Sequence, residues 1–245
     1  MFIDIKPCGD RALLVVLGST INQEINDNIK LLDDSIKQMN ISGVEETIPA
    51  YCSLVINYAP EKIGFCALKK KIMELQDDGT AATEKTHRLI HVPWAYGGHF
   101  GPDMPFAEKY SGLTKDEIIE LHSSTCYRVY MLGFLPGFVY LGGMDQRLKL
   151  PRLESPRLKI PRGAVGIGGS QTGVYPMESP GGWRLLGATP MEFYDPYRDD
   201  PILCRAGDIV KFDPVSSCDY YDIRSEILHG RYSPVIEERW EENEH

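Results

Sequence analysis

Three glycine-rich stretches that also carry polar side chains are the residues best suited to bind a ligand. They span residues 133–138, 166–173 and 179–183. Glycine lets backbone N–H groups approach a ligand closely, and consecutive N–H groups form concavities that bind anions. A β-barrel also needs glycines at its corners and turns, which is the alternative interpretation of each glycine. Gln171 and Thr172 lie in the densest cluster and are its main polar candidates.

Three Pro-Arg pairs follow one another at intervals of five residues, at positions 151–152, 156–157 and 161–162. Each proline fixes φ and lacks an N–H donor, so this stretch is predicted to be neither a helix nor a central strand. In an extended segment, two-residue alternation predicts that Arg157 faces away from Arg152 and Arg162. Guanidinium groups suit phosphate or carboxylate ligands. Solvated surface or partner contact is the alternative for each arginine.

His122 and Asp103 are the candidates for acid–base chemistry. His122 ends a predicted helix, where it can bind a ligand or act as a general base. As a cation it would instead cap the helix carbonyls, which is the favoured interpretation. Asp103 precedes a predicted helix and is interpreted first as its N-cap, with catalysis as the alternative.

The common signatures of a self-contained enzyme are absent from the sequence. It has no Walker A loop, no G-x-S-x-G elbow and no H-E-x-x-H pair. The six histidines lack ligand spacing, so no metal site is predicted. We therefore expect this chain to depend on a partner for catalysis.

The first 80 residues carry alternating strand and helix signals, which predict a small two-layer α/β sandwich. Strands are predicted at residues 11–17 and 53–58, and a capping box at residues 20–23 predicts the start of a helix. Two apolar stripes at spacings of three and four mark the helices. They are Ile25, Ile29, Leu32, Ile36 and Met39, and then Phe65, Leu68, Ile72 and Leu75.

Residues 77–85 lack periodicity and are predicted to be a linker. Beyond it, residues 86–235 hold helix signals at 104–110 and 114–122. Short strand-like runs lie at 164–167, 191–194 and 209–212. Short strands separated by Gly and Pro are typical of a β-barrel or sandwich. Residues 236–245 are predicted to be a solvated acidic tail.

Charge and cysteine usage exclude several classes of function. The formal net charge of −9 argues against nucleic acid and against an anionic membrane surface. No signal peptide and no apolar run of membrane-spanning length are visible. The six cysteines are scattered without a CxxC pair, so they are predicted to be free thiols of a cytoplasmic protein.

The longest motifs resemble the family that holds the B subunit of prokaryotic 5-oxoprolinase (PxpB), the sporulation-kinase inhibitor KipI and allophanate hydrolase subunit 1. The resemblance covers nearly the whole chain. Its motifs are YGGHFGPDM (96–104), YRVYMLGFLPGF (127–138), GGSQTGVYP (168–176) and SPGGWRLLG (179–187), together with residues 9–14, 48–54 and the Pro-Arg series.

This resemblance implies an α+β fold with an N-terminal small α/β sandwich domain plus a C-terminal cyclophilin-like β-barrel domain. It implies partnership with a homologous C subunit (PxpC/KipA-like) and an A subunit (PxpA/LamB-like). Together they would open the lactam 5-oxoproline to glutamate with ATP as co-substrate, the ATP-binding subunit being left open. The catalytic candidates are His122, Gln171 and Asp103. The substrate-binding candidates are Gly133, Phe134, Pro136, Gly137, Phe138, Arg152, Arg157, Gly169, Gln171, Thr172 and Tyr175.

Two other functions remain open at the level of sequence. As a KipI-like inhibitor, the barrel would dock a proline-bearing segment of a sensor kinase in a groove lined by Phe134, Phe138 and Tyr175. As a subunit of an allophanate hydrolase or urea carboxylase-like enzyme, it would form a carboxyltransferase site for biotin.

The linker prediction has a direct test. Brief protease treatment should cut first within residues 77–85 and leave a C-terminal fragment of about 160 residues, because exposed loops between cores open most cheaply. Mass spectrometry of the earliest fragments identifies the site. Initial cleavage within residues 132–140 would contradict the two-domain interpretation.

Overall fold

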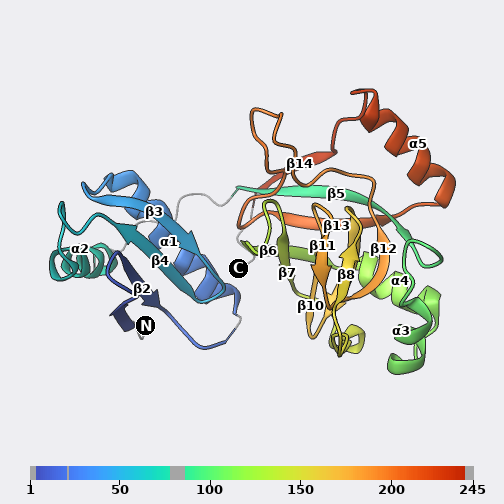
Figure 1. The fold of residues 1–245 in the computed structure, drawn as a ribbon, viewed down its shortest axis with the longest axis horizontal. Coiled ribbons are helices and arrows are strands. Elements are labelled where there is room, and N and C mark those ends of the chain that lie inside the picture. The colour runs from blue at the N-terminus through green and yellow to red at the C-terminus, as the bar shows by residue number, and fades with distance from the viewer. Residues whose placement is uncertain (1–3, 21, 78–85, 241–245) are drawn as a thin grey trace. The chain divides into compact units, whose positions relative to one another are not determined.

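The chain forms two compact units, Met1–Lys85 and Thr86–His245 (Figure 1). The computed structural model describes residues 4–20, 22–77 and 86–240. Apart from Asp77, the predicted linker lies outside the described residues. Each unit buries its own hydrophobic core.

The N-terminal unit is a four-stranded antiparallel sheet with two helices. In sheet order the strands are β1 (Asp4–Pro7), β2 (Ala12–Val16), β4 (Ser53–Tyr58) and β3 (Val44–Pro49), and the helices are α1 (Gln23–Met39) and α2 (Phe65–Asp77). Leu13 and Val15 on β2 lie opposite Ile56 and Leu54 on β4, and all four are buried. Alternation along the strands thus gives the sheet one buried face.

Helix α1 begins at Gln23, two residues later than a helix capped by Thr20 would begin. Its N-cap is Asn22, whose side chain accepts a hydrogen bond from the backbone N–H of Ile25 at 3.2 Å. The prediction that Thr20 caps the helix is therefore wrong. The predicted stripe is buried from Ile29 to Ile36, whereas Met39 on the last turn is 47% exposed.

The C-terminal unit is a closed β-barrel. Its strand order is β12-β9-β10-β7-β6-β13-β5, and a pairing between β12 and β5 closes the ring. These strands are β5 (Thr86–Tyr96), β6 (Cys126–Leu132), β7 (Val139–Gly142), β9 (Ala164–Gly168), β10 (Gln171–Val174), β12 (Arg184–Ala188) and β13 (Ile209–Pro214). A two-stranded sheet of β8 (Arg157–Ile160) and β11 (Ser179–Gly181) accompanies the barrel. The predicted α+β class with a barrel is confirmed.

The predicted acidic tail is wrong for residues 236–240. They form strand β14 (Ile236–Trp240), which pairs antiparallel with the first half of β5. Strand β12 pairs with β5 further along, at Ala95 and Tyr96. Residues 86–90 of β5 are therefore available to pair with β14. Residues 241–245 lie outside the described part of the chain.

Helices cover parts of the barrel (Figure 1). The predicted helices are α3 (Met104–Ser111) and α4 (Lys115–Ser124), the latter begun by a capping box of Thr114 and Glu117. Helix α5 (Ser217–Leu228) was not predicted, although Ser216 and Asp219 form a capping box at its start. No described helix is both long and apolar enough to cross a bilayer.

The predicted strand at 191–194 is wrong. Met191 and Phe193 alternate as a strand would, but they are buried in the barrel core, and Tyr194 forms only an isolated bridge to Ile202. Burial in an irregular segment gives the same local pattern as a strand.

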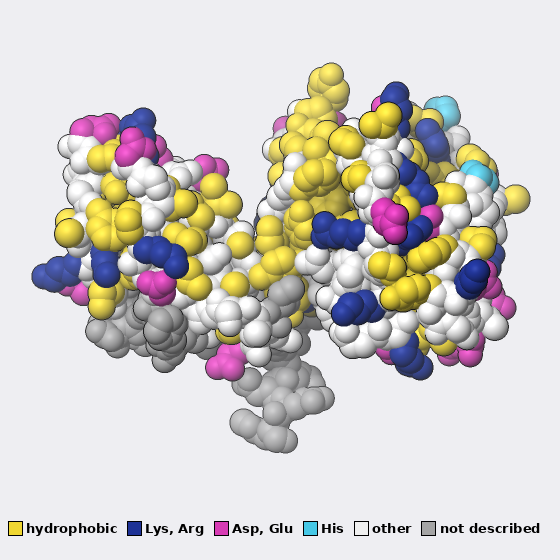
Figure 2. Space-filling model, turned by 60° about the horizontal axis from the view of Figure 1, so that its bottom comes forward, with side chains coloured by type: hydrophobic (Ala, Val, Ile, Leu, Met, Phe, Trp, Pro, Cys, Tyr) yellow, Lys and Arg dark blue, Asp and Glu magenta, His cyan; other side chains and the backbone are white. Residues whose placement is uncertain are grey.

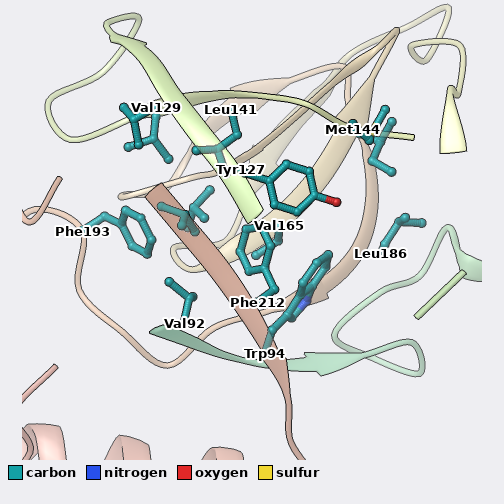
Figure 3. Close-up of a cluster of buried hydrophobic side chains, with 14 of the residues drawn as sticks. Val92, Trp94, Tyr127, Val129, Leu141, Met144, Val165, Leu186, Phe193 and Phe212 are labelled. Atoms are coloured by element: carbon teal, nitrogen blue, oxygen red, sulfur yellow. The ribbon is translucent and has the colours of Figure 1, made fainter. Parts of the chain in front are cut away.

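The same core packs Trp94 of β5 against Phe212 of β13, with ring centroids 4.8 Å apart (Figure 3).

Candidate functional site

A tight loop between β6 and β7 presents an aromatic side chain to solvent. Phe134 has a φ of +68° and is 61% exposed. A bulky residue rarely adopts this left-handed conformation, and such strain is concentrated at functional sites. Gly137 also has a positive φ, and a Cβ there would lie 2.8 Å from the carbonyl oxygen of Phe193. This glycine is thus required by the turn, which holds Phe134 outward.

Behind Phe134 lies a floor of buried aromatic rings. The Phe138 ring lies 5.5 Å from Phe134, 5.2 Å from Tyr175 and 5.6 Å from Trp183, all in edge-to-face contact. Tyr140 lies 4.9 Å from Phe138 and is partly exposed. Edge-to-face pairs of this kind hold one another in place. The result is a rigid apolar floor. Trp183 and Tyr140 were not among the predicted site residues.

Several glycines of the predicted binding motif make room for this floor. A Cβ on Gly168 would lie 2.3 Å from Nε1 of Trp183, and one on Gly173 would lie 3.1 Å from Cζ3 of the same ring. Gly169 exchanges backbone hydrogen bonds with Leu150 at 2.8 and 3.3 Å, with a φ of +67°. These observations favour the structural interpretation of those glycines over a direct contact with ligand.

Two arginines of the Pro-Arg series converge on Trp183. The Arg152 guanidinium lies 5.9 Å from the centroid of the Trp183 ring. Arg157 donates to the Trp183 carbonyl oxygen at 3.4 Å. The expectation that Arg157 faces away from Arg152 is wrong, because β8 begins only at Arg157 and regular alternation does not extend back to residue 152. Arg162 pairs instead with Glu192 at 2.6 Å.

Asp103 holds this arrangement together. Asp103 occupies the N-cap position of α3, as predicted, but its side chain makes no cap hydrogen bond. Instead one carboxylate oxygen accepts from Arg157 at 2.9 Å, and the other accepts from the backbone N–H of Leu185 at 2.7 Å. The Arg184 guanidinium lies 3.7 Å away and stacks on Phe106, 3.6 Å from the ring centroid. The buried carboxylate therefore positions Arg157 rather than facing a ligand.

Two phenols lie within electrostatic range of these arginines. Burial raises the pKa of Tyr175 to about 12, against the opposing effects of a hydrogen bond with the Trp183 backbone and of the charges of Arg152 and Arg157. Burial also raises the pKa of Tyr140, and Arg152 opposes it. Both hydroxyls remain protonated at neutral pH and can donate hydrogen bonds. Arginine charge, phenol donors and an apolar floor together suit a small planar ligand with a carboxylate. We call Phe134, Phe138, Tyr140, Arg152, Arg157, Tyr175 and Trp183 the aromatic–arginine cluster.

The surface of the C-terminal unit agrees with this chemistry. Figure 2 shows Lys and Arg side chains lying among exposed hydrophobic side chains on one face of that unit. Gly133 and Pro136 lie in the same loop as Phe134 and are partly or fully exposed. Gln171 begins β10 opposite Gly168 and is partly exposed.

His122 and Thr172 lie inside the barrel instead of at the cluster. Both are fully buried. The Thr172 hydroxyl donates to the Gly166 carbonyl oxygen at 3.2 Å, so it must accept from His122 Nε2, 3.0 Å away. His122 Nδ1 is then the acceptor for the Tyr96 hydroxyl at 3.3 Å.

The imidazole of His122 is neutral. Burial lowers its pKa to about 3. The helix-cap interpretation required a cation and is therefore wrong. Because the ring is enclosed by Trp94, Tyr127 and Phe212, a general-base role toward an external substrate has no support in the geometry. The described residues contain no group of three or more metal-ligating side chains.

The comparisons with known proteins identify the family. The family described as the carboxyltransferase domain, subdomain C and D, matches residues 3–204. This chain belongs to that carboxyltransferase family. It is 40% identical over 232 residues to the B subunit of 5-oxoprolinase from Bacillus subtilis (strain 168), covering 91% of this chain and 97% of that protein. It is 44% identical over 177 residues to the B subunit of 5-oxoprolinase from Escherichia coli O157:H7, covering 72% and 80%.

A solved structure shows the same fold. The urea amidolyase of Kluyveromyces lactis superimposes with a TM-score of 0.83 at 22% identity, over 97% of this chain and 16% of that one. The family match and the two 5-oxoprolinase B subunits confirm the sequence resemblance to the family of the 5-oxoprolinase B subunit. The carboxyltransferase-family barrel is the element that carries the aromatic–arginine cluster.

The buried His122 makes a pH-dependent prediction. In the unfolded chain a histidine titrates near pH 6.5, so between about pH 6.5 and the folded pKa of about 3 the unfolded state binds one more proton. The free energy of unfolding should therefore fall as pH drops through this window, by up to about 1.4 kcal/mol per pH unit from this residue. His122→Gln should remove that contribution.

Urea denaturation of both proteins between about pH 7 and 5 measures the difference. The variant should be less stable at pH 7, and the gap should narrow as pH falls. His229→Gln, an exposed histidine at the end of α5, is the matched control. An unchanged gap across this range would show that His122 does not titrate as its burial requires.

Proposed function

We propose that this chain is a non-autonomous subunit of an ATP-dependent 5-oxoprolinase, which hydrolyses the lactam 5-oxo-L-proline to L-glutamate. The observation that carries the proposal is similarity to a 5-oxoprolinase B subunit along nearly the full length of both chains. That relative is itself one subunit of an enzyme, which supports action within a complex. The sequence also lacks the signatures of a self-contained catalyst.

The chemistry of the reaction defines what the complex must supply. Amide resonance makes a lactam carbonyl a poor electrophile. In the mechanism we propose, the lactam oxygen attacks the γ-phosphorus of ATP and ADP leaves, which forms a phosphorylated imidate. Water then adds to the activated carbon, and the C–N bond opens with protonation of nitrogen, which leaves an acyl phosphate of glutamate. A second water hydrolyses this acyl phosphate and releases phosphate and L-glutamate. Guanidinium groups and fixed donors stabilise the phosphate and oxyanion charges that develop.

Within this chain, we assign substrate binding to the aromatic–arginine cluster. No ion-pair partner of Arg152 is found among the described residues, and its guanidinium lies over Trp183. Arg152 would receive the carboxylate of 5-oxoproline, and the ring would lie against Phe138 and Trp183. Asp103 fixes the direction of Arg157. Gln171, at the start of β10, would offer an amide that both donates and accepts.

The remaining parts of the reaction belong to partners. We propose a homologous C subunit and an A subunit as the other members of the complex, in the cytoplasm, with ATP bound at a site that the partners complete. One observation favours a second candidate. The family description is that of a carboxyltransferase domain. Carboxyl transfer from biotin is therefore the alternative reaction at the same cluster.

The first test is dependence on partners. The purified chain should show no ATP hydrolysis stimulated by 5-oxoproline, whereas the three-subunit mixture should show it together with glutamate formation. A coupled ADP assay and amino-acid analysis measure both. Full activity of the chain alone would overturn the subunit assignment. Transfer of a carboxyl group from added carboxybiotin, without hydrolysis of 5-oxoproline, would favour the carboxyltransferase alternative.

The second test concerns Arg152. Arg152→Met removes the cation while keeping much of the side chain, so turnover of the assembled enzyme should fall on the order of 10²-fold, as when one charge-stabilising donor is lost. The melting temperature should change little, because the side chain is exposed. Arg147→Met, an exposed arginine paired with Asp145, is the matched control. Equal turnover in the two variants would remove Arg152 from the site.

A further inference from the structure

Arg152 lies in a segment outside the helices and strands, yet the backbone on both sides of it is tied to one short stretch of the barrel. The carbonyl oxygen of Pro151 accepts a hydrogen bond from Nε of Arg184 at 3.3 Å. The backbone N–H of Leu153 donates to the carbonyl oxygen of Gly182 at 2.7 Å. The contacts pair residue 151 with 184 and residue 153 with 182, so the two short segments run in opposite directions.

This register places Arg152 opposite Trp183. The Arg152 guanidinium accordingly lies 5.9 Å from the centroid of the Trp183 ring. The side chain of Arg152 is long and exposed, so ordering it for a ligand costs conformational entropy. Fixing the backbone on both sides narrows the range of positions open to the guanidinium, which reduces that cost. A carboxylate ligand would therefore meet an arginine that is already held over the indole ring.

The guanidinium of Arg184 is itself fixed by three contacts. It stacks on Phe106 of α3, with Cζ 3.6 Å from the ring centroid. Its Nη1 atom lies 3.7 Å from Oδ1 of the buried Asp103. The third contact is the hydrogen bond from Nε to Pro151. A planar guanidinium can stack on a ring and donate from its edge at the same time, which a lysine ammonium cannot do.

Arg184 and Arg152 differ in their access to a ligand. The side chain of Arg184 is only 16% exposed, and Phe106 covers one face of its guanidinium. The carboxylate of Asp103 also lies beside its charge. Arg152 is exposed, and no ion-pair partner of it is found among the described residues. Arg152 is thus placed to meet a ligand, and Arg184 is placed to hold the segment that carries Arg152.

We propose that Arg184 is a positioning residue for Arg152 in the binding of the substrate carboxylate. It acts through the carbonyl group of Pro151 and does not touch the substrate. The inference rests on the proposed function in one respect, because it takes Arg152 as the residue that receives the carboxylate of 5-oxoproline. The hold of Arg184 on Arg152 is a property of this chain alone, so it can be measured without partners.

The first measurement follows the indole N–H signal of Trp183 in ¹H–¹⁵N NMR spectra of the purified chain. The chain has three tryptophans, and Trp183→Phe identifies the signal. Arg152→Met removes the cation over the ring and should shift this signal. Arg184→Met should shift it in the same direction, because Arg152 is no longer held in place. In the Arg152→Met background, Arg184→Met should shift it at least about threefold less, since the two residues act together.

The double variant separates an effect through Arg152 from a direct effect of residue 184 on its neighbour Trp183. The same cycle is then measured as kcat/KM for 5-oxoproline in the assembled three-subunit enzyme. Arg184→Met should lower kcat/KM about tenfold, because a displaced binding group loses part of its interaction. In the Arg152→Met background the same change should cost less than about twofold.

Arg198→Met is the matched control. Arg198 is another partly exposed arginine that donates to a backbone carbonyl oxygen, that of Glu192 at 2.8 Å, but it lies outside the aromatic–arginine cluster. Its loss should leave the Trp183 signal and the turnover per folded complex unchanged. Phe106→Leu removes the ring on which Arg184 stacks and keeps every charge, so it replaces Arg184→Met if that variant does not fold. Melting curves establish that each variant is folded.

The proposal is overturned if Arg184→Met leaves the Trp183 signal unmoved, or if it moves the signal as far without Arg152 as with it. Additive losses of kcat/KM in the two arginine variants would overturn it as well. A complex that assembles but does not hydrolyse 5-oxoproline would refute the proposed function, and the NMR result would still decide whether Arg184 positions Arg152.

Discussion

The buried carboxylate of Asp103 is the interaction on which the candidate site depends. It joins the start of α3 to β12 through the Leu185 N–H, and to β8 through Arg157. A buried charge is tolerated only when it is paired and hydrogen-bonded, so these partners cannot move apart cheaply. The position of Arg157 is therefore set by the framework before any ligand arrives. Such preorganisation is what electrostatic recognition of a substrate requires.

Close packing around Trp183 supplies the other half of the framework. Glycines at 168 and 173 leave the space that the indole ring fills, and Phe138 and Tyr175 contact it from the side. The indole thereby forms a fixed floor, while Arg152 lies over it from solvent. These two glycines thus contribute to binding indirectly, because they leave the space in which the Trp183 ring is held.

Polar groups of the barrel divide between an enclosed set and an open one. His122 and Thr172 satisfy each other in the core, and desolvation keeps the imidazole neutral. Arg152 faces solvent, where a guanidinium keeps its charge. The enclosed groups are satisfied within the fold, whereas the exposed Arg152 guanidinium can interact with a ligand.

The sequence by itself determined the local elements and the family. The helices at 104–111 and 115–124, the strand at 53–58 and the barrel class follow from apolar spacing, caps and turn residues, which act between residues a few positions apart. The family followed from long motifs. The strand predicted at residues 191–194 is an exception. Met191 and Phe193 alternate with less buried residues in an irregular segment, which gives the same pattern of apolar residues as a strand.

Tertiary structure alone decided what the polar residues do. Asp103 binds Leu185, which is 82 positions away, and His122 binds Thr172, which is 50 positions away. Whether a histidine at a helix end is a solvated cation or a buried neutral ring depends on which strands close around it. The spacing of residues near the histidine in sequence does not determine its burial or its charge. Arg152 and Arg157 likewise both contact Trp183 because the two-residue alternation of a strand does not extend from Arg157 back to Arg152. Only the folded barrel brings these groups together.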